Sequence, residues 1–191
     1  LLLTNRRHTL NGGALLTALL FGFAASTMGG APCLIATLIL FARHMQVQHS
    51  MPKTFLVSHS VETIVAIAIP CLAWLTLGRR GLISYPQAQF GYIGTLAIII
   101  YMLNTGTQRH LNWKQPSLFT GFALSLLVIS PALMLDIPLT YFVPVLLMGP
   151  PLAWAYFYWK TSSDTPELNH CLKLCFLAST SSMIVMLFVL L

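Results

Sequence analysis

The chain has 191 residues, of which 57% are apolar and 7% are charged. An ordinary soluble domain is roughly 45–50% apolar and about 25% charged. Ten Lys and Arg residues with four Asp and Glu residues cannot give a globule of this size the charged surface that water requires. The composition therefore excludes a soluble enzyme, a disordered tail and a nucleic-acid-binding domain. It predicts an all-α, polytopic transmembrane helix bundle whose first partner is the lipid bilayer.

The first apolar segment, 10–46, is too long for one membrane span. As a single helix it would measure about 55 Å at 1.5 Å per residue, whereas the hydrocarbon core of a bilayer is about 30 Å thick. It contains Gly29-Gly30-Ala31-Pro32, a sequence that breaks a helical run. We therefore divide the segment there. The predicted spans, which form one domain over 1–191, are 10–28, 31–46, 54–77, 87–104, 116–135, 137–158 and 170–190.

The third predicted span carries the only acid well inside an apolar segment. Glu62 lies about two turns into that span, and an unpaired carboxylate in mid-membrane costs roughly 2.5–3.5 kcal/mol. His59 lies three residues earlier on the same helix face and can partner it. We predict an intramembrane polar pair that orients the helix, and the alternative is a proton relay. One His and one Glu are too few ligands for a metal, so no metal site is predicted.

Prolines and aromatic residues mark the later spans. Prolines inside spans are tolerated where neighbouring helices satisfy the freed carbonyls, which indicates a packed bundle. Asp136 is predicted to be the N-cap of a helix that Pro138 opens. The aromatic run 154–159, just before Lys160, is typical of a membrane-interface belt. The prolines within predicted spans are Pro70, Pro144, Pro150 and Pro151.

The basic residues predict the orientation. With seven spans, eight basic residues fall on one side and two on the other, whereas six spans would give six against four. The first split is the one that the positive-inside rule favours, so the N-terminus should lie on the matrix or cytoplasmic side and the C-terminus opposite. The larger set is Arg6, Arg7, Arg43, Lys53, Arg109, Lys114, Lys160 and Lys173, and the smaller set is Arg79 and Arg80.

Several short motifs follow one another in the order found in one enzyme family. They are Leu126-Leu127-Val128-Ile129-Ser130, Leu135-Asp136-Ile137, Tyr156-Phe157-Tyr158, Ala68-Ile69-Pro70-Cys71, Pro52-Lys53, and the spaced residues Thr4, Arg7 and Gly12. Through them the chain resembles the later two-thirds of protoheme IX farnesyltransferase (haem O synthase), in the UbiA-type prenyltransferase superfamily. The resemblance implies an all-helical bundle of nine spans, of which this chain supplies spans three to nine. It also implies active-site loops on the basic side.

The acidic motifs of that family do not match this chain. The family joins a prenyl diphosphate to an aromatic or porphyrin acceptor, and Mg²⁺ on Asp-rich loops neutralises the diphosphate, because developing charge there needs fixed cations. The resemblance places the first acidic motif before Leu1 and the second within 104–114, which contains no Asp or Glu. We therefore assign no catalytic residue. The cations that remain as contacts for an anionic headgroup or a diphosphate are Arg6, Arg7, Lys53, Arg109 and Lys114.

Three functions are compatible with these patterns. The first is a non-catalytic relative of haem O synthase, without a cofactor, that serves as a structural subunit of a respiratory-type membrane complex. Its partners would be other membrane subunits and a bound lipid, in the mitochondrial or bacterial inner membrane. The second is a protoheme IX farnesyltransferase that lacks its N-terminal part and uses Mg²⁺. The third is a proton-translocating subunit of an NADH dehydrogenase-like complex, although Glu62 is the only acid well inside a span.

Overall fold

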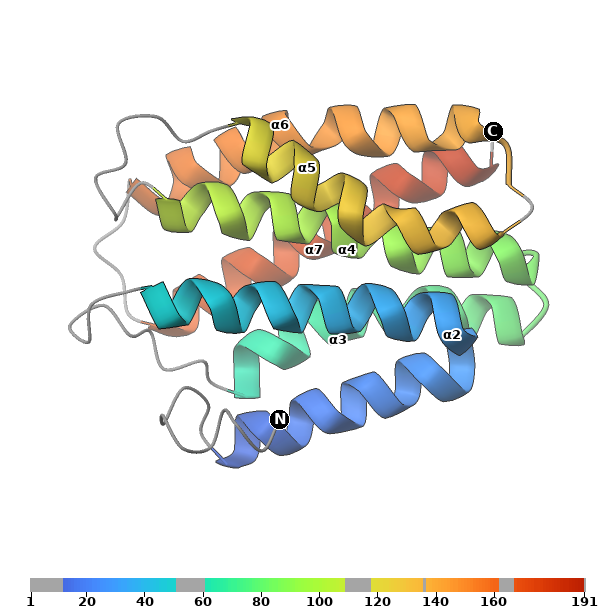
Figure 1. Ribbon diagram of the computed structural model, residues 1–191, viewed down its shortest axis with the longest axis horizontal. Coiled ribbons are helices and arrows are strands. Elements are labelled where there is room, and N and C mark those ends of the chain that lie inside the picture. Colours follow the sequence, from blue (N-terminus) through green and yellow to red (C-terminus); the bar gives the residue numbers. More distant parts are fainter. Residues whose placement is uncertain (1–11, 51–60, 109–117, 136, 162–166, 191) are drawn as a thin grey trace.

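A computed structural model of the protein describes residues 12–50, 61–108, 118–135, 137–161 and 167–190 (Figure 1). The regular structure within these ranges is entirely helical, which confirms the predicted all-α class for the described residues. The elements are α2 (Gly12–Ser50), α3 (Val61–Arg79), α4 (Tyr85–Gln108), α5 (Leu118–Ile129), the 3-10 turns η3 (Ser130–Met134) and η4 (Leu139–Tyr141), α6 (Phe142–Thr161) and α7 (Glu167–Leu190).

Helix α2 consists of two arms that meet at Gly30. Its backbone there has φ 69° and ψ −163°, which is outside the helical region. Only glycine adopts such a positive φ at low cost. We call residues 12–29 the first arm and residues 31–50 the second arm. Figure 1 shows the chain reversing between them, so the second arm runs back along the bundle, and the predicted break is confirmed.

Helix α4 forms the centre of the bundle. Every residue from Ala88 to Met102 is buried. Helices α2, α3, α5, α6 and α7 all pack against it. A helix that is apolar on all sides is stable when protein or lipid surrounds it. Around α4 this role is filled by the five helices named above.

Glycines allow the neighbouring helices to approach α4 closely. A Cβ added to Gly91 of α4 would lie 2.3 Å from a ring carbon of Trp74 in α3. The ring of Tyr101 packs against two glycines, because a Cβ on Gly121 of α5 or Gly149 of α6 would lie 2.9 or 3.1 Å from it. Small residues at such contacts are characteristic of helix packing in membranes.

Large apolar side chains are exposed on the outer faces of the helices. They belong to both arms of α2 and to α3, α5, α6 and α7, and several are more than half exposed. Examples are Leu16 at 59%, Phe23 at 68%, Leu38 at 54%, Ile69 at 59%, Leu127 at 51%, Leu147 at 64% and Met183 at 69%. Among the side chains that the structure describes, the charged ones are Arg43, Arg79 and Arg80.

The helical segments overlap the predicted spans. The two arms of α2, together with α3, α4, α5 with η3, η4 with α6, and α7, make seven segments in the described ranges. By length and composition one stretch, Gly13–Arg43, qualifies as a membrane-crossing helix, and it contains the break at Gly30. Shorter apolar helices are Ile64–Arg79, Thr120–Met134, Leu139–Leu152 and Phe176–Leu187. That each segment crosses a bilayer stays a prediction.

The junction before α6 differs from the prediction. Pro138, with φ −56° and ψ 133°, is itself the N-cap of η4, and no side chain caps that turn. Because Pro138 has an extended ψ, it cannot be the first residue of the helix. One 3-10 turn follows it, and α6 begins at Phe142. Asp136, the predicted N-cap, lies outside the described residues. The expected prolines inside helices are present at Pro70, Pro150 and Pro151.

Candidate functional site

Most of the predicted site residues lie outside the described part of the chain. This holds for Arg6, Arg7, Lys53, Arg109 and Lys114, the predicted headgroup or diphosphate contacts. It holds also for His59. Glu62 belongs to the helical backbone of α3, but its side chain is not described, so the predicted pair with His59 stays a prediction.

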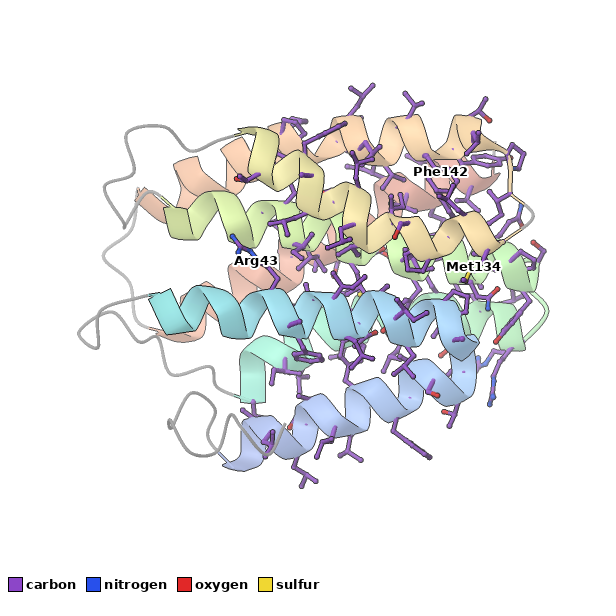
Figure 2. All side chains as sticks on the ribbon, in the orientation of Figure 1. Arg43, Met134 and Phe142 are labelled. Atoms are coloured by element: carbon purple, nitrogen blue, oxygen red, sulfur yellow. The ribbon has the colours of Figure 1, made fainter. Side chains whose placement is uncertain are left out.

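Arg43 is the described cation nearest to the predicted basic side. It follows Cys33, Ala36, Thr37 and Leu40, the buried residues among the described side chains of the second arm, and it is half-buried. In Figure 2 it lies between α2 and α4 towards one end of the bundle, whereas Met134 lies towards the other end. Arg43 therefore stands at the border between the apolar interior and that end of the bundle.

Side chains from α3 and α4 gather at the opposite end, around the turn at Gly30. The last carbonyls of a helix have no partner within the helix. Here three of them accept hydrogen bonds from residues far along the chain. Arg79 Nη2 donates to Thr27 O (2.7 Å), Tyr85 Oη donates to Met28 O (2.7 Å) and Gln89 Nε2 donates to Gly29 O (2.8 Å). We call Arg79, Tyr85 and Gln89 the carbonyl clamp.

The clamp residues differ in burial and charge. Gln89 is buried, so its bond satisfies a carbonyl that water cannot reach, and an unsatisfied buried group would cost about 1–3 kcal/mol. Arg79 and Tyr85 are exposed at the rim. The positive charge of Arg79 also lies at the negative end of the helix dipole of the first arm, which is a favourable placement.

The start of α4 joins a second helix end to the same region. Ser84 Oγ donates to Gln87 Oε1 (2.8 Å), and the Ser84 backbone N–H points to the same oxygen at 3.3 Å. Gln87 Nε2 in turn donates to Val189 O at the end of α7 (3.3 Å). Ser84 and Gln87 stand at the spacing of a capping box, so the sequence held a signal for this feature that our predictions missed.

A buried pair of hydroxyl groups links α2 to α4. Thr37 Oγ1 and Tyr92 Oη lie 2.6 Å apart, and both residues are almost completely buried. Thr37 Oγ1 donates its single hydrogen to Cys33 O (2.7 Å), so the Tyr92 hydroxyl is the donor between the two. Cys33 and Cys71, whose thiols are free, are buried in the same core cluster as Tyr92.

The first arm of α2 covers this pair through Phe21. The Phe21 ring centroid lies 6.1 Å from that of Tyr92 and 6.2 Å from that of Phe41 in the second arm. Phe21 is 3% exposed and is the one large side chain of the first arm that is fully buried. The first arm therefore contacts the ring that carries one of the two hydroxyls.

Chemically, the described polar groups hold helices together. The clamp binds α3 and α4 to the first arm, the Thr37–Tyr92 pair binds α2 to α4, and Ser125 Oγ donates to Ala97 O to bind α5 to α4 (2.8 Å). Within the described residues, no group of three His, Cys, Asp or Glu side chains gathers as metal ligands.

No family model, curated protein or solved structure matches this chain. The resemblance to haem O synthase therefore depends on the short sequence motifs given above.

Proposed function

We propose that this chain is a polytopic integral membrane protein whose seven helical segments each cross the bilayer. The observation that carries the proposal is the exposed apolar surface on the outer faces of the helices. Leaving a large apolar side chain in water rather than burying it forgoes about 1.5–3 kcal/mol, and lipid contact removes that penalty at every such position. Large exposed apolar surfaces on a chain mark sites of contact with a membrane or another protein.

The arginines support the proposed orientation. Arg79 and Arg80 stand at the end of α3 beside the Gly30 turn, because Arg79 donates to Thr27. Arg43 lies thirteen residues beyond Gly30, about 20 Å along the second arm at 1.5 Å per residue. Arg43, the described member of the larger set, therefore lies towards the other end of the bundle from Arg79 and Arg80, which supports the proposed orientation.

We further propose that the protein is a non-catalytic relative of haem O synthase that serves as a structural subunit of a respiratory-type complex. The mitochondrial inner membrane is the proposed location, with the bacterial inner membrane as the alternative. The acid-free segment 104–114 supports this assignment, because a diphosphate-binding Mg²⁺ needs carboxylate oxygens. The described polar contacts between helices are of the kind that maintain a scaffold.

Reporter fusions test the membrane topology. Fusions of truncated chains after Phe55, Asn112 and Asp164 should report the N-terminal side, and fusions after Leu82 and Asp136 the opposite side. Alkaline carbonate should leave the full-length protein in the membrane pellet. Release of the protein by carbonate, or fusions that all report one side, would contradict the proposal.

Purification in a mild detergent tests the function. A stoichiometric assembly with other membrane proteins supports the structural role. The assay for the second candidate supplies protohaem, farnesyl diphosphate and Mg²⁺ to the purified protein, and no haem O should form. If a solitary chain makes haem O, the structural proposal is wrong and the farnesyltransferase assignment replaces it.

A further inference from the structure

We propose that the first arm of α2 is a hinged cover, which turns about Gly30 and opens the Thr37–Tyr92 pair to its surroundings. That these surroundings are lipid depends on the membrane insertion proposed above, but the hinge itself does not. Four features of the described residues support the inference: the turn, the interface, the position of the fastening bonds and the group beneath the cover.

The turn of α2 is made at Gly30, where the helix can bend. Within the described helix Gly12–Ser50, the backbone leaves the helical region at Gly30. The nearest atoms to a Cβ built there are Gln89 Nε2 at 3.9 Å and Pro32 Cδ at 4.0 Å, whereas a Cβ on Gly29 would lie 2.5 Å from Cys33 Sγ, so the open space is confined to Gly30 itself. Hinges are short segments that absorb large changes in φ and ψ, and a glycine with a positive φ fits that role.

The interface beneath the first arm contains little apolar area. Its buried side chains are those of Ala14, Ala18 and Ala25, together with Phe21, and Met28 is partly buried against the main core. Ala14 and Ala18 form with Ile64 a small cluster that is separate from the main core. Each alanine buries little area, so Phe21 contributes the largest buried apolar side chain of the arm.

The fastening bonds of the first arm are concentrated at its pivot. All three clamp acceptors, Thr27, Met28 and Gly29, lie within three residues of Gly30. Hydrogen bonds so close to Gly30 hold the angle between the two arms. They make no contact with the other end of the first arm, which lies about 25 Å away along the helix. Loss of the Gln89 bond should therefore loosen the angle of the arm.

The first arm lies over a buried pair of polar groups, the hydroxyls of Thr37 and Tyr92. Withdrawal of Phe21 from the ring of Tyr92 would open the side of the bundle on which the hydroxyls of Thr37 and Tyr92 are bonded, within the buried cluster that also contains Cys33 and Cys71. Opening would thus create a polar site on an otherwise apolar flank of the bundle.

Pulsed electron paramagnetic resonance between two spin labels tests the hinge. The labels are placed at Leu16→Cys in the first arm and Leu127→Cys in α5, both exposed positions. The full chain carries Cys33→Ala, Cys71→Ala, Cys171→Ser and Cys175→Ser, because opening of the arm would expose the free thiols of Cys33 and Cys71 to the label. The protein is measured in detergent, so the result does not depend on whether the membrane topology is correct.

Two variants are compared with matched controls. Phe21→Ala should raise the population of a second, changed interlabel distance about tenfold or more, which corresponds to about 1.4 kcal/mol. Phe23→Ala removes an exposed phenylalanine of the same arm and should leave the distances as in the parent. Gln89→Leu should likewise raise the second population, whereas Gln87→Leu, which removes the bonds to Ser84 and Val189 instead, should not.

The comparison of distances decides the inference. If Phe21→Ala and Gln89→Leu give the same single distance as their controls, the first arm is a fixed part of the bundle and the proposal is wrong. Should Phe21→Ala aggregate, the pair Gln89→Leu and Gln87→Leu decides in either direction. A second population that appears equally in all four variants also overturns the proposal, because it would not arise from the hinge.

Discussion

The ring of Trp74 occupies the space that a side chain on Gly91 would need, since a Cβ there would lie 2.3 Å from the nearest ring carbon. Trp74 belongs to α3 and Gly91 to the central helix α4, so this contact sets how closely the two helices approach. Trp74 is 2% exposed and therefore cannot swing out to make room.

Gly91→Ala should therefore destabilise the protein by about 1–3 kcal/mol, the usual cost of overpacking a core. Gly94→Ala is the matched control on the same helix, because its Cβ would meet Val145 at 3.4 Å, an ordinary contact. Thermal unfolding in detergent measures both variants. Equal melting temperatures for the two would show that α3 and α4 are not held at the distance described.

Gly30→Ala should also destabilise the protein, for a reason of backbone conformation rather than packing. With φ 69° and ψ −163° its backbone lies in a region that only glycine adopts readily, and an L-residue there costs about 1–3 kcal/mol, although a Cβ would meet no atom closer than 3.9 Å. Gly22→Ala in the same helix also meets no atom within 4 Å, but its backbone is helical. That control should be neutral or stabilising by about 1 kcal/mol, since alanine is the better helix former. Thermal unfolding measures both variants. If Gly22→Ala lowers the melting temperature more than Gly30→Ala does, the turn at Gly30 is wrong.

The Thr37–Tyr92 pair predicts an asymmetric double-mutant cycle. Tyr92→Phe removes the donor but leaves Thr37 bonded to the carbonyl of Cys33, so it should cost about 0.5–1.5 kcal/mol. Thr37→Val leaves the Tyr92 hydroxyl buried without an acceptor and should cost about 1–3 kcal/mol. The double variant should cost less than the sum of the two. Unfolding measurements give the cost of each variant. If the costs of the two single variants sum to the cost of the double variant, the hydroxyls do not interact.

The sequence predicts those features of the fold that depend on residues close together in the chain. The break in α2 is local, because Gly29-Gly30-Ala31-Pro32 carries it within four residues, and it was predicted. The capping box of Ser84 and Gln87 is equally local and was overlooked. The central position of α4 was not predictable, since a segment that must be apolar in lipid looks the same as one that is buried by other helices.

Local sequence patterns cannot predict the described polar contacts between helices. Thr37 and Tyr92 are 55 residues apart, and Arg79 lies 52 residues from its acceptor Thr27. Nothing in the residues around either partner identifies the other one. The two arginines at the end of α3 were interpreted only as topological signals, whereas the structure gives Arg79 a specific bond as well. Their different environments lead to one more prediction.

Arg79→Gln and Arg80→Gln remove the same charge from adjacent positions and should differ in effect. Arg79 donates to the carbonyl of Thr27 at the negative end of a helix dipole, so its loss should cost about 0.5–1.5 kcal/mol. Arg80 is an exposed residue at the end of α3, and its replacement should stay within about 0.5 kcal/mol of the parent. Because salt screens the dipole contribution, the difference between the variants should narrow as ionic strength rises. Thermal unfolding at low and high salt measures this, and identical curves for the two variants would mean that Arg79 does not hold the first arm.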